Sequence, residues 1–290
     1  KVEESNMHGI FSVLLTLSVL GYVFSSIDHH IGGIVEKMRA KGDISRTEAT
    51  LELAHFSLKA SNKEEIVESE AFLLLIAQLY SESQDLRIIS VQTIGILGES
   101  IEIKEKFVEY ELIPVLLSLI TKDSEQQTLA VVQTVGNLAH SSKVQAQVGD
   151  SGGVQMMAPF LHSTSEQLRR VTAGALGNLA MYEPNCARIK EAGLIADLVN
   201  LLSPEKYPNS HPTTEEVALG AIRNLLVDES LVEDLVSANI VPALLRLKRD
   251  GNEASQEIAY ELMEYLSNAV AELPGTEPDE FTGEAGTGEL

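Results

Sequence analysis

The chain has no tryptophan, one cysteine and few aromatic or basic residues. Cys186 is the single cysteine among 290 residues, which excludes an internal disulfide framework and any zinc or iron–sulfur site built from several cysteines of one chain. Aromatic residues make up only 5% of the sequence, whereas apolar residues make up 44%. That apolar content is ample for a sizeable core, so we expect one or two folded domains.

Basic residues are outnumbered by acidic ones. Lys and Arg total 21 against 43 Asp and Glu, for a formal net charge of −22. Because phosphate neutralisation supplies much of the affinity for nucleic acid, we do not expect a nucleic-acid partner. The field of so acidic a chain favours a protein or extended peptide of basic character as the partner.

The segment 9–27 carries no charged side chain. As a helix it would be about 28 Å long, close to the thickness of the hydrocarbon core of a bilayer. Lys37, Arg39 and Lys41 follow it, which predicts a membrane-associated protein whose remaining chain lies on the cytosol-like side, in cytosol, stroma or matrix. The alternatives are a buried helix that caps the fold of a soluble cytoplasmic protein, or a helix that binds a partner.

The middle of the chain repeats itself. Three independent columns of apolar residues recur every 41 residues, apart from one step of 46 that all three columns share. Such agreement predicts stacked repeats, none of which could bury its apolar face alone. The columns are Leu97, Leu138, Leu179, Leu225 and Leu266; Leu75, Leu116, Met157, Leu198 and Leu244; and Ile66, Phe107, Val148, Ile189 and Leu235.

Within each repeat the apolar spacing is that of helices, as in Val131, Val135 and Leu138. We expect a short, a medium and a long helix per unit. The long helices should follow side-chain N-caps, and the first two helices should be joined by residues that accept a left-handed turn. The candidate caps are Ser124, Ser163 and Thr213, and the candidate turn residues are Gly152, Gly193 and Asn239.

The unit resembles the armadillo repeat. This resemblance implies an all-α, right-handed α-solenoid. The period gives it about five repeats plus a half repeat, and the candidate transmembrane helix precedes them. The fourth unit departs from the pattern, since Arg223 replaces the Gly before Asn224. The matching motifs are Gly-Asn-Leu-Ala at 136–139 and 177–180, Glu-Ala-Gly at 191–193 and Ile-Val-Pro-Ala-Leu-Leu at 240–245.

We divide the chain into an N-terminal segment 1–42, a solenoid 43–271 and an acidic tail 272–290, which has too little apolar surface to fold. The extra residues of the fourth unit lie at 203–214 and predict a loop that tolerates shortening. The expected units are the half repeat 43–62 and the repeats 63–103, 104–144, 145–185, 186–231 and 232–271.

No motif of a catalytic, cofactor or metal site is present: there is no phosphate-binding loop, no nucleophile elbow and no zinc-binding His-Glu-x-x-His helix. His29 and His30 would point about 100° apart on a helix, a poor arrangement for one metal ion. Arg188 and Lys190 could lower the thiol pKa of Cys186, but a structural cysteine is the favoured interpretation. We therefore expect no enzyme, no cofactor and no metal.

The resemblance implies a non-catalytic protein-binding scaffold. In armadillo proteins the third helices line a concave groove, where a ladder of Asn side chains holds the backbone of an extended peptide. Asn137, Asn178 and Asn224 match these positions, and an amide offers both a donor and an acceptor to a peptide. The alternative is that these amides bond between neighbouring helices. The side chains that would specify the partner are Gln133, His140, Arg223 and Val227.

Two other functions remain open at this level. One is a soluble transport adaptor of the importin-α type, in which a Trp one turn before each groove Asn stacks on cargo lysines. This chain has Gln133, Gly174 and Gly220 at those positions, which counts against that function. The other is a structural subunit of a large membrane-associated assembly, in which the repeats are packing surface only.

Overall fold

The computed structural model describes residues 31–203, 205–207 and 211–271. The described residues form seventeen α-helices, α2 to α18, and two 3-10 helices, η1 and η2. They divide after Met157 into two compact units. This all-α architecture confirms the fold class that the apolar spacing predicts.

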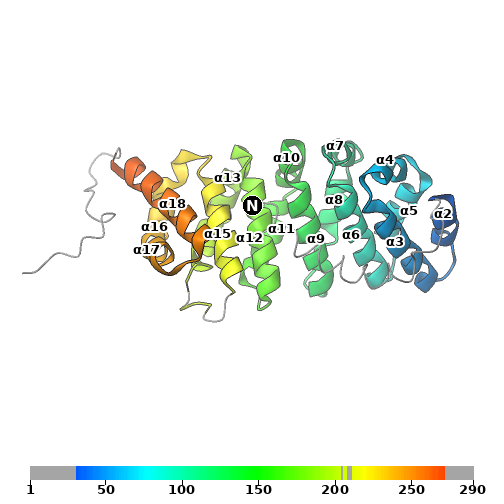
Figure 1. Ribbon diagram of the computed structural model, residues 1–290, viewed down its shortest axis with the longest axis horizontal. Helices are drawn as coiled ribbons and strands as arrows, with labels where there is room; N and C mark the ends of the chain where they lie inside the picture. Colours follow the sequence, from blue (N-terminus) through cyan, green and yellow to red (C-terminus); the bar gives the residue numbers. More distant parts are fainter. Residues whose placement is uncertain (1–30, 204, 208–210, 272–290) are drawn as a thin grey trace, which may run out of the picture. The chain divides into compact units, whose positions relative to one another are not determined.

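In the first unit, long helices pack side by side. Helix α6 contacts α3 on one side and α9 on the other, and Figure 1 shows the three in this order. The long helices are α3 (Asp43–Ser57), α6 (Gln84–Leu97) and α9 (Glu125–Leu138). The shorter ones are α2 (Ile31–Met38), α4 (Ala60–Glu68), α5 (Glu70–Gln78), α7 (Ile101–Glu109), α8 (Leu112–Ser118), α10 (Ser142–Asp150) and α11 (Gly153–Met157).

The second unit repeats this arrangement, because α15 packs against both α12 and α18. These three long helices carry the surface on which the candidate site lies. They are α12 (Glu166–Ala180), α15 (Pro212–Leu225) and α18 (Glu253–Ala271). The shorter elements are η1 (Ala158–His162), α13 (Glu183–Glu191), α14 (Leu194–Asn200), η2 (Glu229–Leu231), α16 (Val232–Ser237) and α17 (Ile240–Asp250).

The three periodic columns form the core of each unit. All fifteen column residues have 0% exposed surface, so the period marks the positions where each helix faces its neighbours. In the first unit Phe72 stacks on Phe107, with 5.4 Å between ring centroids. The prediction that stacking buries the apolar face of each repeat is confirmed.

One of the three expected N-caps is correct. The Ser124 hydroxyl accepts a hydrogen bond from the Gln127 N–H at 3.1 Å and begins α9. Helix α12 begins instead after Ser165, two residues later than expected, and α15 begins after His211, whose ring nitrogen accepts from the Thr213 N–H. Both segments offer several polar residues in succession, so residue type alone does not fix where the helix begins.

The left-handed turns occur at the expected places. Gly152, Gly193 and Asn239 have φ values of 75°, 73° and 60°. A fourth left-handed residue, Glu111, has a φ of 50° and lies one period of 41 residues before Gly152. Residue type did not indicate Glu111, because glutamate is not a residue that favours this conformation.

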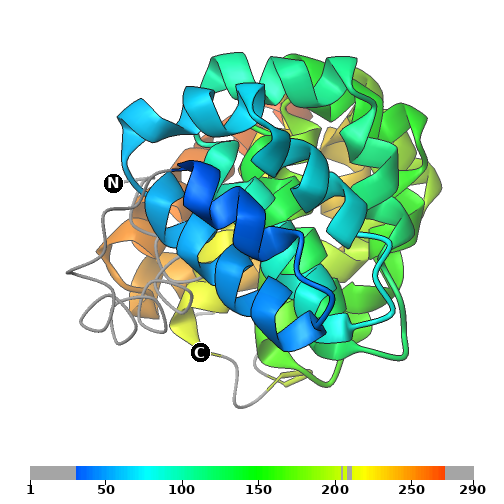
Figure 2. The same ribbon diagram turned by 90° about the vertical axis from the view of Figure 1, so that its right-hand side faces the viewer.

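The packed helices begin before residue 43, where the expected solenoid starts. Helix α2 lies within the segment 1–42, yet it contacts α3 and α5, and Figures 1 and 2 both show it beside α3. Its side chains Ile31, Ile34 and Met38 are buried there. The expected boundary is late because α2 is short and begins soon after the charge-free run ends at residue 27.

The candidate transmembrane segment 9–27 lies outside the described residues. Among the helices that are described, none is both long and apolar enough to cross a bilayer.

Candidate functional site: a pocket along α12, α15 and α18

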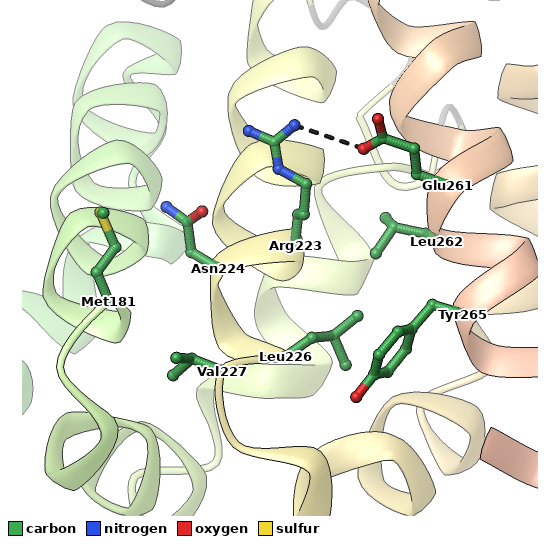
Figure 3. Close-up of a pocket in the computed structure, with 8 residues that line it drawn as sticks. All are labelled: Met181, Arg223, Asn224, Leu226, Val227, Glu261, Leu262 and Tyr265. Atoms are coloured by element: carbon green, nitrogen blue, oxygen red, sulfur yellow. Dashed lines mark ion pairs between the residues drawn. The ribbon is translucent and has the colours of Figure 1, made fainter.

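A pocket of about 460 Å³ opens on the surface of the second unit. Figure 3 shows that its walls come from the C-terminal end of α12, the last turn of α15 and the middle of α18. Such a volume falls in the range of about 300–1,000 Å³ that is typical of ligand pockets. The lining residues are Met181, Arg223, Asn224, Leu226, Val227, Glu261, Leu262 and Tyr265.

Most of the lining is apolar. Leu262 is 1% exposed and belongs to the core, whereas Met181 and Val227 are 55% and 54% exposed. Two large apolar side chains therefore face solvent beside a buried wall.

An ion pair closes one edge of the pocket. The Arg223 guanidinium lies 3.6 Å from the Glu261 carboxylate, as the dashed line in Figure 3 marks. Both side chains are about half exposed, so water screens the pair and its contribution to stability is small, about 0–1 kcal/mol. The pair places one positive and one negative charge at the edge of an apolar pocket, where they can interact with charged groups of a ligand.

Tyr265 forms the wall opposite Met181. Burial, followed by the negative charge of Glu229, raises the pKa of the Tyr265 phenol above its ordinary value. The phenol therefore stays protonated at neutral pH, where its hydroxyl can donate a hydrogen bond to an acceptor in the pocket.

Asn224 connects two of the helices that form the pocket. Its side-chain amide donates to the Gly177 carbonyl oxygen of α12 at 3.0 Å. This is the bond between neighbouring helices that the sequence left open as the alternative to peptide binding. It uses one of the two N–H donors of the amide.

The structure brings together three of the seven predicted site residues. Arg223, Asn224 and Val227 line the pocket, whereas the half-buried Asn178 lies on the adjacent α12. The other three residues belong to the first unit. Gln133 and Asn137 are half-buried on α9, and the ring Nδ1 of the exposed His140 lies 3.0 Å from the Asn137 carbonyl oxygen.

Sequence reasoning missed Met181 and Tyr265, although the period contains the signal for both. Met181 lies 46 residues before Val227, and Tyr265 lies 41 residues after Asn224, so each occupies the register of a predicted site residue. They were missed because candidates were chosen by residue type. Glu261 and Leu262 were missed because their contribution depends on how α18 packs against α15.

Cys186 is structural. Its side chain is fully buried, and its S–H donates to the Ala180 carbonyl oxygen at 3.2 Å. Burial raises the pKa of the thiol to about 12, with a further contribution from Asp228 and Glu183. The interpretation of a structural cysteine is confirmed, but the expected lowering of the thiol pKa is not found, because burial raises it. Arg188 donates to the Asn185 side-chain oxygen, and Lys190 pairs with Asp234.

Metal ligands do not gather anywhere in residues 31–203, 205–207 and 211–271. No group of three or more His, Cys, Asp or Glu in that part of the chain is placed to hold an ion.

Comparison with known proteins agrees with this geometry. Residues 141–181 match the family model of the armadillo/beta-catenin-like repeat, over a span equal to the 41-residue period. No curated protein matches the sequence.

Solved structures match most of the chain. A designed armadillo repeat protein is 21% identical, with 82% of this chain and 100% of that chain covered and a TM-score of 0.75. Computationally designed armadillo repeat proteins for modular peptide recognition match at 20% identity over 81% and 99%, with a TM-score of 0.73. A designed armadillo repeat protein in complex with the peptide (KR)4 matches at 20% over 82% and 100%, with a TM-score of 0.74.

These similarities define the fold of the protein. The chain contains an armadillo repeat and has the armadillo fold over most of its length. The resemblance to armadillo repeats that the sequence motifs indicated is confirmed.

Proposed function

We propose that this chain is a non-catalytic armadillo scaffold that binds an extended peptide of basic character along α12, α15 and α18. The observation that carries the proposal is the pocket beside Asn224, where exposed apolar side chains, an amide and an ion pair meet. These groups suit the side chains and backbone of a peptide.

The charge of the chain supports a basic partner. The formal net charge is −22, and Glu257, Glu261 and Glu264 are exposed on α18. A peptide rich in Lys and Arg would be attracted by this field before it makes contact. The designed protein that carries the peptide (KR)4 shows that the armadillo fold accommodates such a ligand.

The test uses a fluorescein-labelled (Lys-Arg)4 peptide as the probe and fluorescence anisotropy as the measurement. We expect saturable binding to the full chain and none of an acidic (Glu-Asp)4 peptide. Absence of binding of the basic peptide contradicts the proposal.

The Asn residues are tested with the same probe. Changing Asn178 and Asn224 together to Ala should abolish binding while the circular dichroism spectrum stays unchanged; Asn137 on α9 of the first unit lies outside this surface. Asn200→Ala on α14 is the matched control, since Asn200 is also half-buried but does not line the pocket. Unchanged binding by the double variant would place the peptide on another surface. A lost helical signal would show that the Asn amides are structural, as the Asn224–Gly177 bond suggests.

We further propose that residues 9–27 anchor the scaffold to a membrane, with the repeats on the cytosol-like side. The charge-free sequence and the basic residues that follow it support this localisation. Flotation of the full chain with liposomes, compared with a chain that lacks residues 1–30, tests it. Equal solubility of both chains without detergent would contradict anchoring and favour the soluble alternative.

A further inference from the structure

We propose that the pocket beside Asn224 is a subsite for one large apolar side chain, such as leucine, within a basic peptide. The cationic residues on either side of that side chain would lie on the rim formed by the glutamates of α18. This inference rests on the peptide-binding function proposed above and names the ligand chemistry of the same site.

The composition of the walls argues for an apolar occupant. Met181 and Val227 are the exposed groups on one side, and the buried Leu262 and the half-buried Leu226 continue the apolar surface inward. A peptide leucine placed among them would remove apolar surface from water on both partners. A peptide with only polar side chains would leave Met181 and Val227 exposed at its edge.

The ion pair argues against a cationic side chain inside the pocket. Arg223 already neutralises Glu261 across the opening. An inserted Lys or Arg would compete with Arg223 for the same carboxylate, and its charge would be desolvated among leucine and valine side chains.

The rim of the pocket on α18, in contrast, is acidic and suits cationic side chains. Glu257 lies one helical turn before Glu261 and Glu264 lies about one turn after it, and all three are exposed. Residues three and four apart share one face of a helix, so two carboxylates flank the pocket edge along α18. Arg223 reaches Glu261, which leaves Glu257 and Glu264 as the carboxylates for Lys or Arg residues that flank the leucine.

The test compares two labelled peptides on the full chain by anisotropy: (Lys-Arg)4, and the same peptide with one central Arg replaced by Leu. We expect the leucine peptide to bind about ten-fold more tightly, although it carries one positive charge fewer. A third peptide with Ala in place of that Leu should lose most of this gain. Equal or weaker binding of the leucine peptide overturns the inference. If (Lys-Arg)4 still binds in that case, the proposed peptide-binding function stands and only the leucine subsite is wrong.

Variants of the pocket separate apolar contact from charge. Val227→Asp should abolish the preference for leucine while it preserves or increases the affinity for (Lys-Arg)4, because it adds an acid where it removes an apolar contact. Met181→Ala should reduce the preference several-fold. The control is Tyr260→Ala, since Tyr260 is 54% exposed on α18 but lies outside the lining. A leucine preference that survives both pocket variants overturns the subsite.

Variants of the rim test the second half of the inference. Replacing Glu257 and Glu264 together by Gln should weaken both peptides by a similar factor and leave their ratio unchanged. An unchanged affinity contradicts the placement of the cationic residues. Concentration-dependent self-association that Val227→Asp abolishes, without any leucine preference, would identify a second copy of the chain as the occupant and overturn the proposal.

Discussion

Single glycines set the distance between the long helices of the second unit. A Cβ atom added at Gly177 on α12 would lie 2.7 Å from both Cα and Cβ of Ala221 on α15, a distance that no packed pair of carbon atoms tolerates. At Gly220, one residue earlier on α15, an added Cβ would meet nothing within 4 Å. Two helical glycines therefore have different roles, and only their tertiary surroundings distinguish them.

We predict that Gly177→Ala destabilises the protein and that Gly220→Ala does not. The first change must separate α12 from α15 and should lower the free energy of unfolding by about 1–3 kcal/mol. The second relieves the helix penalty of glycine and should raise it by about 0.5–1 kcal/mol. Urea unfolding followed by circular dichroism measures both. Equal stability of the two variants would show that the helix pair does not pack as closely as described.

We predict that the Cys186 thiol is unreactive in the folded protein. Burial raises its pKa to about 12, so almost none is thiolate, the nucleophilic form, at pH 8. Titration with Ellman's reagent at pH 8 should find no reactive thiol in the native chain and one per chain in guanidinium chloride. Rapid reaction of the native protein would contradict the buried placement.

At the scale of elements, the inserted loop between α14 and α15 contacts the start of α12. The Arg169 guanidinium lies over the Tyr207 ring, 4.6 Å from its centroid, and also donates to the Ser163 carbonyl oxygen. The Glu166 carboxylate accepts hydrogen bonds from the His211 N–H and the Thr214 hydroxyl. Burial raises the pKa of Glu166, but these bonds outweigh it and hold the pKa below its ordinary value. The loop therefore not only connects α14 to α15 but also packs against the start of α12.

We predict that removing residues 205–209 lowers stability slightly and that Tyr207→Ala reproduces the loss. The deletion restores the 41-residue step and changes loop closure little, but it removes a cation–π contact worth about 0.5–1 kcal/mol. Both variants should melt about 1–4 °C lower, as measured by calorimetry. A deletion that melts far below Tyr207→Ala would show that the loop makes further stabilising contacts.

At the scale of the whole molecule, charge governs association more than fold. Acids outnumber bases by 43 to 21, and the ion pairs that the structure describes lie mostly at half-exposed positions such as Lys143–Glu105 and Lys190–Asp234. Such pairs add little stability in water. The surplus of acid therefore acts mainly as a long-range field on approaching partners.

We predict that binding of the (Lys-Arg)4 peptide weakens at least about ten-fold when the salt concentration rises from about 0.05 to about 0.5 M, because screening shortens the reach of this field. The leucine preference of the pocket should persist at both concentrations, since apolar contact is not screened. Anisotropy titrations at several salt concentrations measure both. An affinity that does not change with salt would show that the acidic surface does not contribute to binding.

The sequence by itself determined the repeats, the helices and the core. Positions such as Leu138, Phe107 and Leu198 recur at a fixed step because every repeat must bury the same face against its neighbours. A buried position requires an apolar residue, so the sequence alone identifies these positions. The left-handed turns at Gly152 and Gly193 followed for a similar reason, because few residue types adopt that conformation at low cost.

Only the tertiary structure decided which residues form the pocket. The repeat pattern predicts that Asn224 lies on the surface. The structure shows in addition that its amide donates to the carbonyl oxygen of Gly177, which lies 47 residues earlier in the sequence. Glu261 and Leu262 enter the site because α18 packs against α15. The packing of α12 against α15 distinguishes Gly177 from Gly220, and the structure places the cap of α12 at Ser165 rather than at Ser163. These properties depend on the distances between helices. The periodic pattern of the sequence predicts which face of each helix is buried, but not which side chains of neighbouring helices contact one another.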